Sequence, residues 1–154
     1  MKAILSPLAF ALYQSVQGED PPNSIEEWQF GMTDEEADSL LLLVLRGAKR
    51  ATSSLYQLYV LEREELPKEG SLSIITNSDR SAACLIRNTS VEILPFQRVS
   101  AEFAAAEGEG DRSLAHWRAV HREFFTRDLL RHGLQFQESD LVVGVRFEVL
   151  GFRD

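Results

Sequence analysis

The sequence predicts a single α+β domain, and two patterns carry that prediction. Segments with helical spacing of apolar residues alternate with short β-branched or apolar runs that are separated by turn residues. The chain has 154 residues, of which 44% are apolar and 26% charged, an ordinary composition for one globular domain. Four or five short strands with interspersed helices favour a sheet curled into a small barrel.

The first helix is predicted over residues 6–16 and is expected to pack on this domain. Ser6 is its N-cap, and Pro7 takes the first helical position, where a proline is favourable. The apolar start superficially resembles a signal peptide, but Pro7 interrupts it and no suitable cleavage site follows. No apolar run reaches the length of a membrane span. We therefore expect a cytoplasmic protein without membrane association.

Three further helices are predicted, each closed by a glycine. They run from Thr33 to Gly47, from about Ser100 to Gly108, and from Ser113 to about Arg131 before Gly133. At the start of the first of these, Glu36 completes a capping box with Thr33.

The remaining apolar runs are predicted strands. They cover residues 71–76, 82–88, 90–94 and 141–152, with turn residues such as Asn77-Ser-Asp79 between them. The single cysteine, Cys84, lies inside the second run, so we expect a buried small side chain and a reducing compartment.

Charge is distributed unevenly along the chain. The formal net charge is −8, which argues against a general nucleic-acid binder. Residues 3–45 contain eight acidic residues and no Lys or Arg, whereas residues 112–132 contain five Arg and all three His. This asymmetry favours a pocket for a nucleotide or a short strand over a surface that grips a long duplex.

Several short motifs occur in a fixed order. They are Trp28-Gln-Phe-Gly31, Gly47-Ala-Lys-Arg-Ala-Thr52, Leu66-Pro-Lys-x-Gly70 and the long pattern from Glu107-Gly-Glu-Gly-Asp to Trp117-x-x-x-His121-x-x-Phe-Phe125. Together they resemble the larger bacterial branch of the ASCH (activating signal cointegrator homology) family, over roughly residues 8–150. Met32 and Ser71 depart from the family pattern, which usually has Asp at both places.

The resemblance implies a PUA-like fold, a small β-barrel of about five to six strands flanked by helices. Members of the family are variously RNA-binding modules, ribonucleases and amidohydrolases of acetylated cytidine. The resemblance therefore specifies the fold more closely than the reaction.

Lys49 is the leading candidate for chemistry. It follows Gly47, so its ammonium is expected beside a helix C-terminus, where the dipole stabilises a cation. The residues alone indicate only a helix-end lysine; the resemblance places it in the family cleft, as a phosphate ligand, nucleophile or base. Thr52 resembles the threonine of the Lys-x-x-Thr arrangement in small acetylcytidine amidohydrolases, although alone it is an ordinary strand residue. Ser53 is a weaker version of the same proposal, and Arg50 is expected to bind substrate.

A carboxylate must complete either reaction, and Glu107 or Glu109 is the natural source. Glycines on both sides of Glu109 would let the backbone approach a ligand closely. The simpler interpretation is a flexible, solvated acidic loop.

Five further residues are expected to contact substrate or RNA. Arg112 and Ser113, at the start of the long helix, would hold a phosphate, with Ser113 also acting as N-cap. Trp28 and Phe30 would stack a base. His121 would serve as a ribonuclease base, although a histidine hydrogen-bonded near the core is the simpler expectation.

No metal or other cofactor is predicted. His116 and His121 are five residues apart, about 140° around a helix, so they cannot form an i,i+4 zinc pair. The lead hypothesis is an RNA- or nucleotide-binding protein with ribonuclease activity as one expectation, acting on single-stranded RNA. An amidohydrolase of a modified nucleoside that uses Lys49, Thr52 and Glu107 or Glu109 is the second hypothesis, and a non-catalytic RNA-binding module is the third. The oligomeric state is left open.

Overall fold

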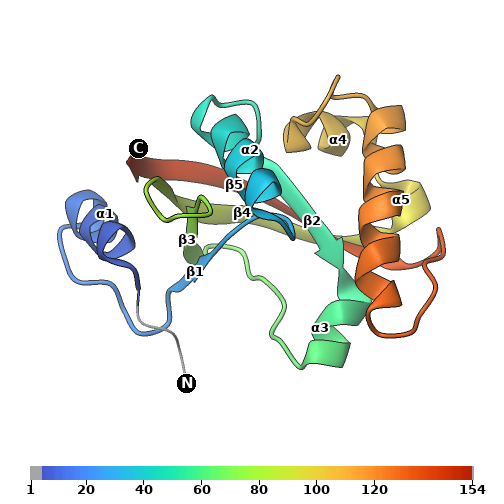
Figure 1. The fold of residues 1–154 in the computed structure, drawn as a ribbon, viewed down its shortest axis with the longest axis horizontal. Helices are drawn as coiled ribbons and strands as arrows, with labels where there is room; N and C mark the ends of the chain where they lie inside the picture. Colours follow the sequence, from blue (N-terminus) through green and yellow to red (C-terminus); the bar gives the residue numbers. More distant parts are fainter. Residues whose placement is uncertain (1–4, 154) are drawn as a thin grey trace. The chain divides into compact units, whose positions relative to one another are not determined.

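A computed structural model describes residues 5–153 and confirms the α+β class. The described helices and strands follow one another as α1 (Pro7–Gln17), β1 (Glu26–Trp28), α2 (Asp34–Leu45), β2 (Ala51–Leu55), α3 (Tyr56–Glu62), β3 (Leu72–Thr76), β4 (Ala83–Pro95), a 3₁₀ turn (Phe96–Arg98), α4 (Ala101–Glu107), α5 (Leu114–Leu130) and β5 (Leu141–Arg153) (Figure 1). The strands form a five-stranded sheet in the order β1-β3-β4-β5-β2.

The four predicted helices are confirmed together with their caps. Ser6, Thr33, Ser100 and Ser113 each accept a hydrogen bond from a backbone N–H in the first turn of the helix that follows. Each of these bonds satisfies a donor that the helix itself leaves unpaired. None of the described helices combines the length and apolar character that a bilayer crossing requires.

The predicted ranges omit β1, β2 and α3, although Thr52 was expected in a strand, and they divide one further strand. Helix α3 has no side-chain cap and no buried residue, and strand β1 has only three residues, so neither produces a clear pattern. The predicted strands 82–88 and 90–94 are one strand, β4. Pairing continues through the polar break because the backbone of Asn88 bonds to both Gly70 and Ser71.

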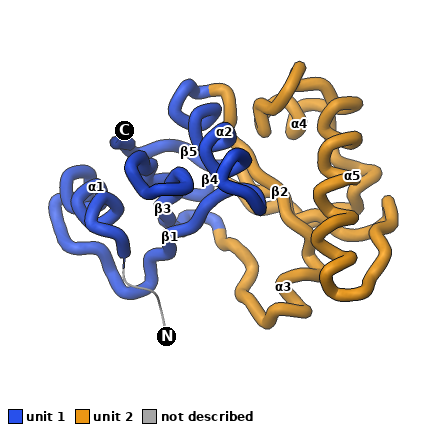
Figure 2. The backbone as a smooth tube through the Cα atoms, in the orientation of Figure 1, with its two compact units in different colours: residues 1–47, 69–89, 147–154 blue, residues 48–68, 90–146 orange. Residues whose placement is uncertain are grey.

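The described chain divides into two compact units, coloured separately in Figure 2. Unit 1 takes residues up to 47, residues 69–89 and residues from 147 on; unit 2 takes residues 48–68 and 90–146. In unit 1, α1 and α2 contribute to two apolar clusters, one of which contains the buried Cys84. The prediction of a single domain stays a prediction.

Unit 2 has its own core, and this core supports the predicted catalytic residues. Phe96, Trp117 and Phe125 pack together, with ring centroids 5.2 Å and 6.2 Å from Phe96. Around them, β2, α4, α5 and the start of β5 contribute the other buried apolar residues, together with Val99 just before α4. In β2 and β5 the antiparallel register pairs Ser53 with Gly144.

Candidate functional site

A close crossing of two backbone segments positions the site. Helix α4 ends at Glu107 because Gly108 adopts the left-handed conformation, with φ 74°. A Cβ at Gly108 would lie 2.1 Å from the Ala48 carbonyl oxygen, so only glycine fits. The segment that leads into β2 therefore runs directly against the end of α4. The Arg50 N–H joins them by donating to the Ala106 carbonyl at 2.7 Å.

This crossing buries the ammonium of Lys49, a residue only 1% exposed. The Nζ atom lies 3.1 Å from Glu107 Oε1, 3.1 Å from Glu109 Oε2 and 3.4 Å from the Glu107 carbonyl oxygen. The sequence predicted Lys49 beside the C-terminus of the helix that Gly47 closes. The helix end that its ammonium contacts is the C-terminus of α4. Burial lowers the pKa of Lys49, but the charges of Glu107 and Glu109 outweigh it and raise the pKa above 10.5. Lys49 is therefore a buried cation.

Glu107 is the centre of a network of buried polar side chains. Its Oε2 atom accepts hydrogen bonds from Ser53 Oγ at 2.6 Å, from His121 Nε2 at 3.2 Å and from Trp117 Nε1. Burial raises the pKa of this carboxyl, but the charge of Lys49 and the hydrogen bond from His121 lower it well below its usual range. Glu107 is ionised and enclosed by donors, so it holds other groups in place and is not available to accept a proton.

Glu109 is the carboxylate of this group that solvent reaches. Its side chain is 19% exposed, against 2% for those of Lys49 and Glu107. The following loop is tight: Gly110 has φ 58°, and a Cβ there would lie 2.2 Å from Nε2 of His116. The 3.1 Å bond to Nζ of Lys49 places the Glu109 carboxylate beside the ammonium, so Glu109 is not merely part of a solvated acidic turn.

Strand β2 separates the two hydroxyl residues of the predicted site. Neighbouring side chains of a strand point to opposite faces, and Ser53 is the one on the face of Glu107. Thr52 is half-buried and points to the other face, as does Ser54, whose Oγ lies 2.8 Å from the Tyr59 hydroxyl. The structure thus brings Ser53, and not Thr52, to the buried network.

The other predicted binding residues of unit 2 have structural contacts. Arg50 donates from its guanidinium to the Lys49 carbonyl at 2.8 Å, and the exposed Arg112 donates from Nε to the Ala105 carbonyl at 3.2 Å. Ser113 caps α5 through a bond from the His116 N–H, as expected. Both arginines are therefore anchored near the end of α4.

Trp28 and Phe30 belong to unit 1. Phe30 is 5% exposed and lies in an apolar cluster of that unit, and Trp28 packs against the same cluster. Their ring centroids are 5.0 Å apart in an edge-to-face arrangement. Phe30 therefore has no open face on which a base would stack, whereas Trp28 is half-buried.

One group of side chains within residues 5–153 has the spacing of metal ligands. It consists of Glu107, Glu109 and His121, each of which offers one ligand atom within 4.8 Å of the others. The ammonium of Lys49 already lies 3.1 Å from both carboxylates. A divalent cation would have to displace this ammonium, so the donor set fits a fixed ammonium better than a metal.

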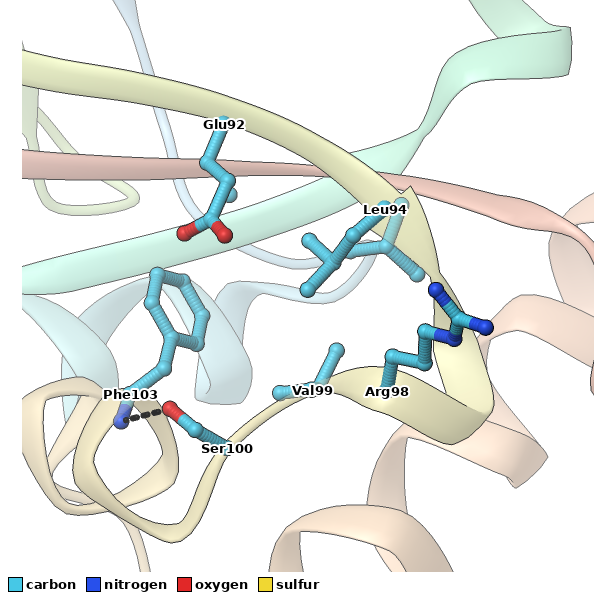
Figure 3. A pocket seen from close by; sticks show the side chains of 8 residues that line it. Glu92, Leu94, Arg98, Val99, Ser100 and Phe103 are labelled. Carbon is cyan, nitrogen blue, oxygen red and sulfur yellow. Dashed lines mark hydrogen bonds between the residues drawn. The ribbon is translucent and has the colours of Figure 1, made fainter.

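A small pocket elsewhere in unit 2 lacks these residues. Strand β4 contributes Glu92 and Leu94 to it, and the chain around the start of α4 contributes Arg98, Val99 and Phe103 (Figure 3). Phe103 lies one turn before Glu107 on α4. The pocket thus borders the same helix but contains no group of the buried network.

The sequence patterns identify Trp117 only as part of a motif and miss its contact with Glu107. Trp117 is 2% exposed, packs on Phe96, and also donates its indole N–H to Glu107. The sequence contained one indication of this contact, because Trp117 and His121 are four residues apart and therefore share a helix face.

Comparisons with known proteins agree with this architecture. The family model described as ASCH domain matches residues 26–151. A solved ASCH domain from Lactobacillus crispatus JV V101 is 36% identical, with 92% of this chain and 91% of that chain covered and a TM-score of 0.82. A solved protein from Enterococcus faecalis V583 is also 36% identical, with 89% and 82% covered and a TM-score of 0.80. A search of curated proteins finds no match. These matches confirm the PUA-like α+β class expected from the motifs, and the chain belongs to the ASCH domain family.

Proposed function

We propose that this protein hydrolyses an amide on a modified nucleobase, with acetylated cytidine as the substrate to test. One observation carries the proposal: Glu109, a solvent-accessible carboxylate, is held 3.1 Å from the buried ammonium of Lys49. A carboxylate in this position is suited to take a proton from water. An adjacent fixed cation is suited to stabilise the oxyanion that forms when water attacks a carbonyl.

The steps conserve charge beside Lys49. Glu109 removes a proton from water, the water oxygen bonds to the acetyl carbon, and the carbonyl oxygen becomes an oxyanion. The negative charge moves from Glu109 to this oxygen, and the Lys49 N–H that had donated to Glu109 becomes available to the oxyanion. Protonated Glu109 then delivers its proton to the nitrogen that leaves, the C–N bond breaks, and acetic acid and cytidine result. The acetic acid releases its proton to solvent and leaves as acetate. No additional reactant is needed.

Two features favour an uncharged substrate over a phosphate. One is the negative charge of Glu109, and the other is that each N–H group of Lys49 already has an acceptor. Lys49 has three N–H groups and three acceptors within 3.4 Å, so the resting ammonium has no spare donor for a phosphate oxygen. A phosphodiester would also bring its charge next to Glu109. Ribonuclease activity and simple RNA binding are therefore outcomes of the test and not the lead proposal.

The test offers two substrates to the purified protein. Acetylated cytidine and, separately, single-stranded RNA are incubated with it, and products are resolved by mass. We expect acetate and cytidine, and intact RNA. Shortened RNA together with intact acetylcytidine would contradict the proposal, and two intact substrates would favour a binding module.

A matched pair of variants identifies the carboxylate. Glu109→Gln keeps the size of the side chain but cannot accept the proton, so we expect a loss of about 10²–10⁴-fold in kcat. Glu102→Gln is the control, since Glu102 lies on α4 with a side chain 87% exposed. We expect its activity to equal that of the wild type.

A further inference from the structure

We propose that His121 is held as an imidazolium ion. Its charge makes the buried group of Lys49, Glu107 and His121, beside Glu109, net positive. Loss of this charge at alkaline pH then limits activity. The charge assignment stands on hydrogen-bond geometry, with the aromatic neighbours and the surrounding charges in support. The effect on activity rests on the proposed function.

Both ring nitrogens of His121 face oxygens that need a donor. Nδ1 lies 2.9 Å from the Trp117 carbonyl oxygen, which can only accept, so Nδ1 carries a hydrogen. Nε2 lies 3.2 Å from Oε2 of Glu107. A second hydrogen, on either Nε2 or that carboxyl, must occupy this contact.

The surroundings of Glu107 place that hydrogen on the imidazole. Its Oε1 faces the Lys49 ammonium and its Oε2 faces the indole N–H of Trp117, and neither of these groups can accept a hydrogen bond. The Ser53 hydroxyl also donates to Oε2, at 2.6 Å, so three groups besides the imidazole donate to this carboxylate and stabilise its ionised form. With Glu107 ionised, Nε2 must donate, and His121 carries two N–H groups.

The aromatic neighbours also suit a cation. The indole ring of Trp117 stacks on the imidazole with centroids 4.3 Å apart and an interplanar angle of 16°, and Phe125 lies 5.6 Å away edge-on. A cation over an aromatic face gains electrostatic attraction that a neutral ring lacks.

The charged groups around His121 and its partner Glu107 come from three segments. Glu107 comes from α4, Glu109 from the loop that follows, and Lys49 from the segment before β2. Burial lowers the pKa of His121, but the hydrogen bond from the imidazole to Glu107 and the charges of Glu107 and Glu109 raise the pKa above 6.5.

The formal charges then explain how His121 would influence the reaction. Lys49 and His121 contribute two positive charges, and Glu107 contributes one negative charge. The buried group therefore presents one net positive charge toward Glu109 and toward the oxyanion that replaces its charge. When His121 loses a proton, the buried group becomes neutral and the oxyanion loses part of its stabilisation. His121 thus acts as a positioning residue through Glu107 and does not contact substrate.

Nitrogen NMR on the full-length protein labelled at histidine tests the charge directly. The three histidines are assigned with His116→Gln and His132→Gln, and their ring nitrogens are followed from pH 5 to pH 9. We expect two protonated ring nitrogens on His121 at pH 7, where an exposed histidine is mostly neutral. A neutral His121 ring with a single N–H at pH 6.5 would overturn the proposal.

The pH profile of acetylcytidine hydrolysis tests the consequence. We expect wild-type kcat to fall at alkaline pH through the same midpoint as the NMR titration of His121. His121→Gln keeps a donor for Glu107 but has no charge, so it should lose roughly tenfold in kcat near neutral pH and lose the midpoint. An unchanged profile in this variant would overturn the link to activity. If wild type releases no acetate but NMR shows the imidazolium, the proposed function fails while the charge assignment holds.

Discussion

The ammonium of Lys49 and the carboxylate of Glu107 form an ion pair at 3.1 Å, and each side chain is only 2% exposed. The residues are 58 positions apart, and the pair joins the entry to β2 with the end of α4. Removing one partner of such a pair leaves an uncompensated buried charge, whereas removing both does not.

Lys49→Met is therefore expected to destabilise the fold strongly. The variant removes the ammonium that both Glu107 and Glu109 contact and leaves His121 as the one cation bonded to Glu107, at a cost of about 3–5 kcal/mol. Equilibrium urea unfolding measures the loss, and Lys68→Met, at an exposed lysine, should change stability by less than about 0.5 kcal/mol. The double variant Lys49→Met/Glu107→Gln should recover part of the loss. If the double variant were less stable than Lys49→Met, the ion pair would not be the cause.

Alanine substitutions at Gly108 and Gly133 distinguish the cost of a steric clash from the cost of a left-handed backbone conformation. Both have positive φ, 74° and 71°, but a Cβ at Gly108 would meet the Ala48 carbonyl at 2.1 Å while one at Gly133 meets nothing within 4 Å. We expect Gly133→Ala to cost about 1–2 kcal/mol. Gly108→Ala should cost clearly more and also reduce activity, because the crossing that buries Lys49 must open. Equal losses of thermal stability in the two variants would show that the crossing is not tight.

Ser53 and Thr52 differ in the face of β2 that they occupy. Ser53→Ala removes a 2.6 Å hydrogen bond to the buried Glu107 carboxylate, so we expect a loss of about 1–3 kcal/mol. Thr52→Val keeps the shape of a half-buried strand residue and should change stability by about 0.5 kcal/mol or less. Thermal unfolding of both variants checks the difference. A larger effect at Thr52 would contradict the placement of Ser53 in the network.

The stability of the fold should depend on pH through His121. Its pKa is raised above 6.5 in the folded state, so its contribution is complete below pH 6.5 and is lost as pH rises through the folded pKa. Unfolding free energies of wild type and His121→Gln, measured from pH 5.5 to pH 9, should converge with rising pH. A difference that stays constant over this range would contradict the assignment.

Much of the fold could be predicted because its signals are local. Within a few residues, local patterns indicate where helices begin and end, and the structure confirms them. These patterns are Ser6-Pro7, Thr33 with Glu36, and Gly108. Helix α3 lacks both a side-chain cap and a buried residue, so its stability depends on tertiary context that no local pattern reveals.

The site was predictable in composition but not in geometry. Family motifs brought Lys49, Glu107 and Glu109 together, but they did not show that Glu107 is enclosed and Glu109 accessible. That distinction arises because Gly108 lets one carboxylate point inward and the next reach solvent, which depends on backbone conformation. The preference for Ser53 over Thr52 likewise depends on which face of β2 meets α4.

The release of acetate from acetylated cytidine by wild type, Glu109→Gln and Glu102→Gln tests the central claim most directly. The account predicts equal rates for wild type and Glu102→Gln, and a rate at least about a hundredfold lower for a Glu109→Gln protein that circular dichroism shows to be folded. Undiminished release by a folded Glu109→Gln, or no release by wild type, would contradict it.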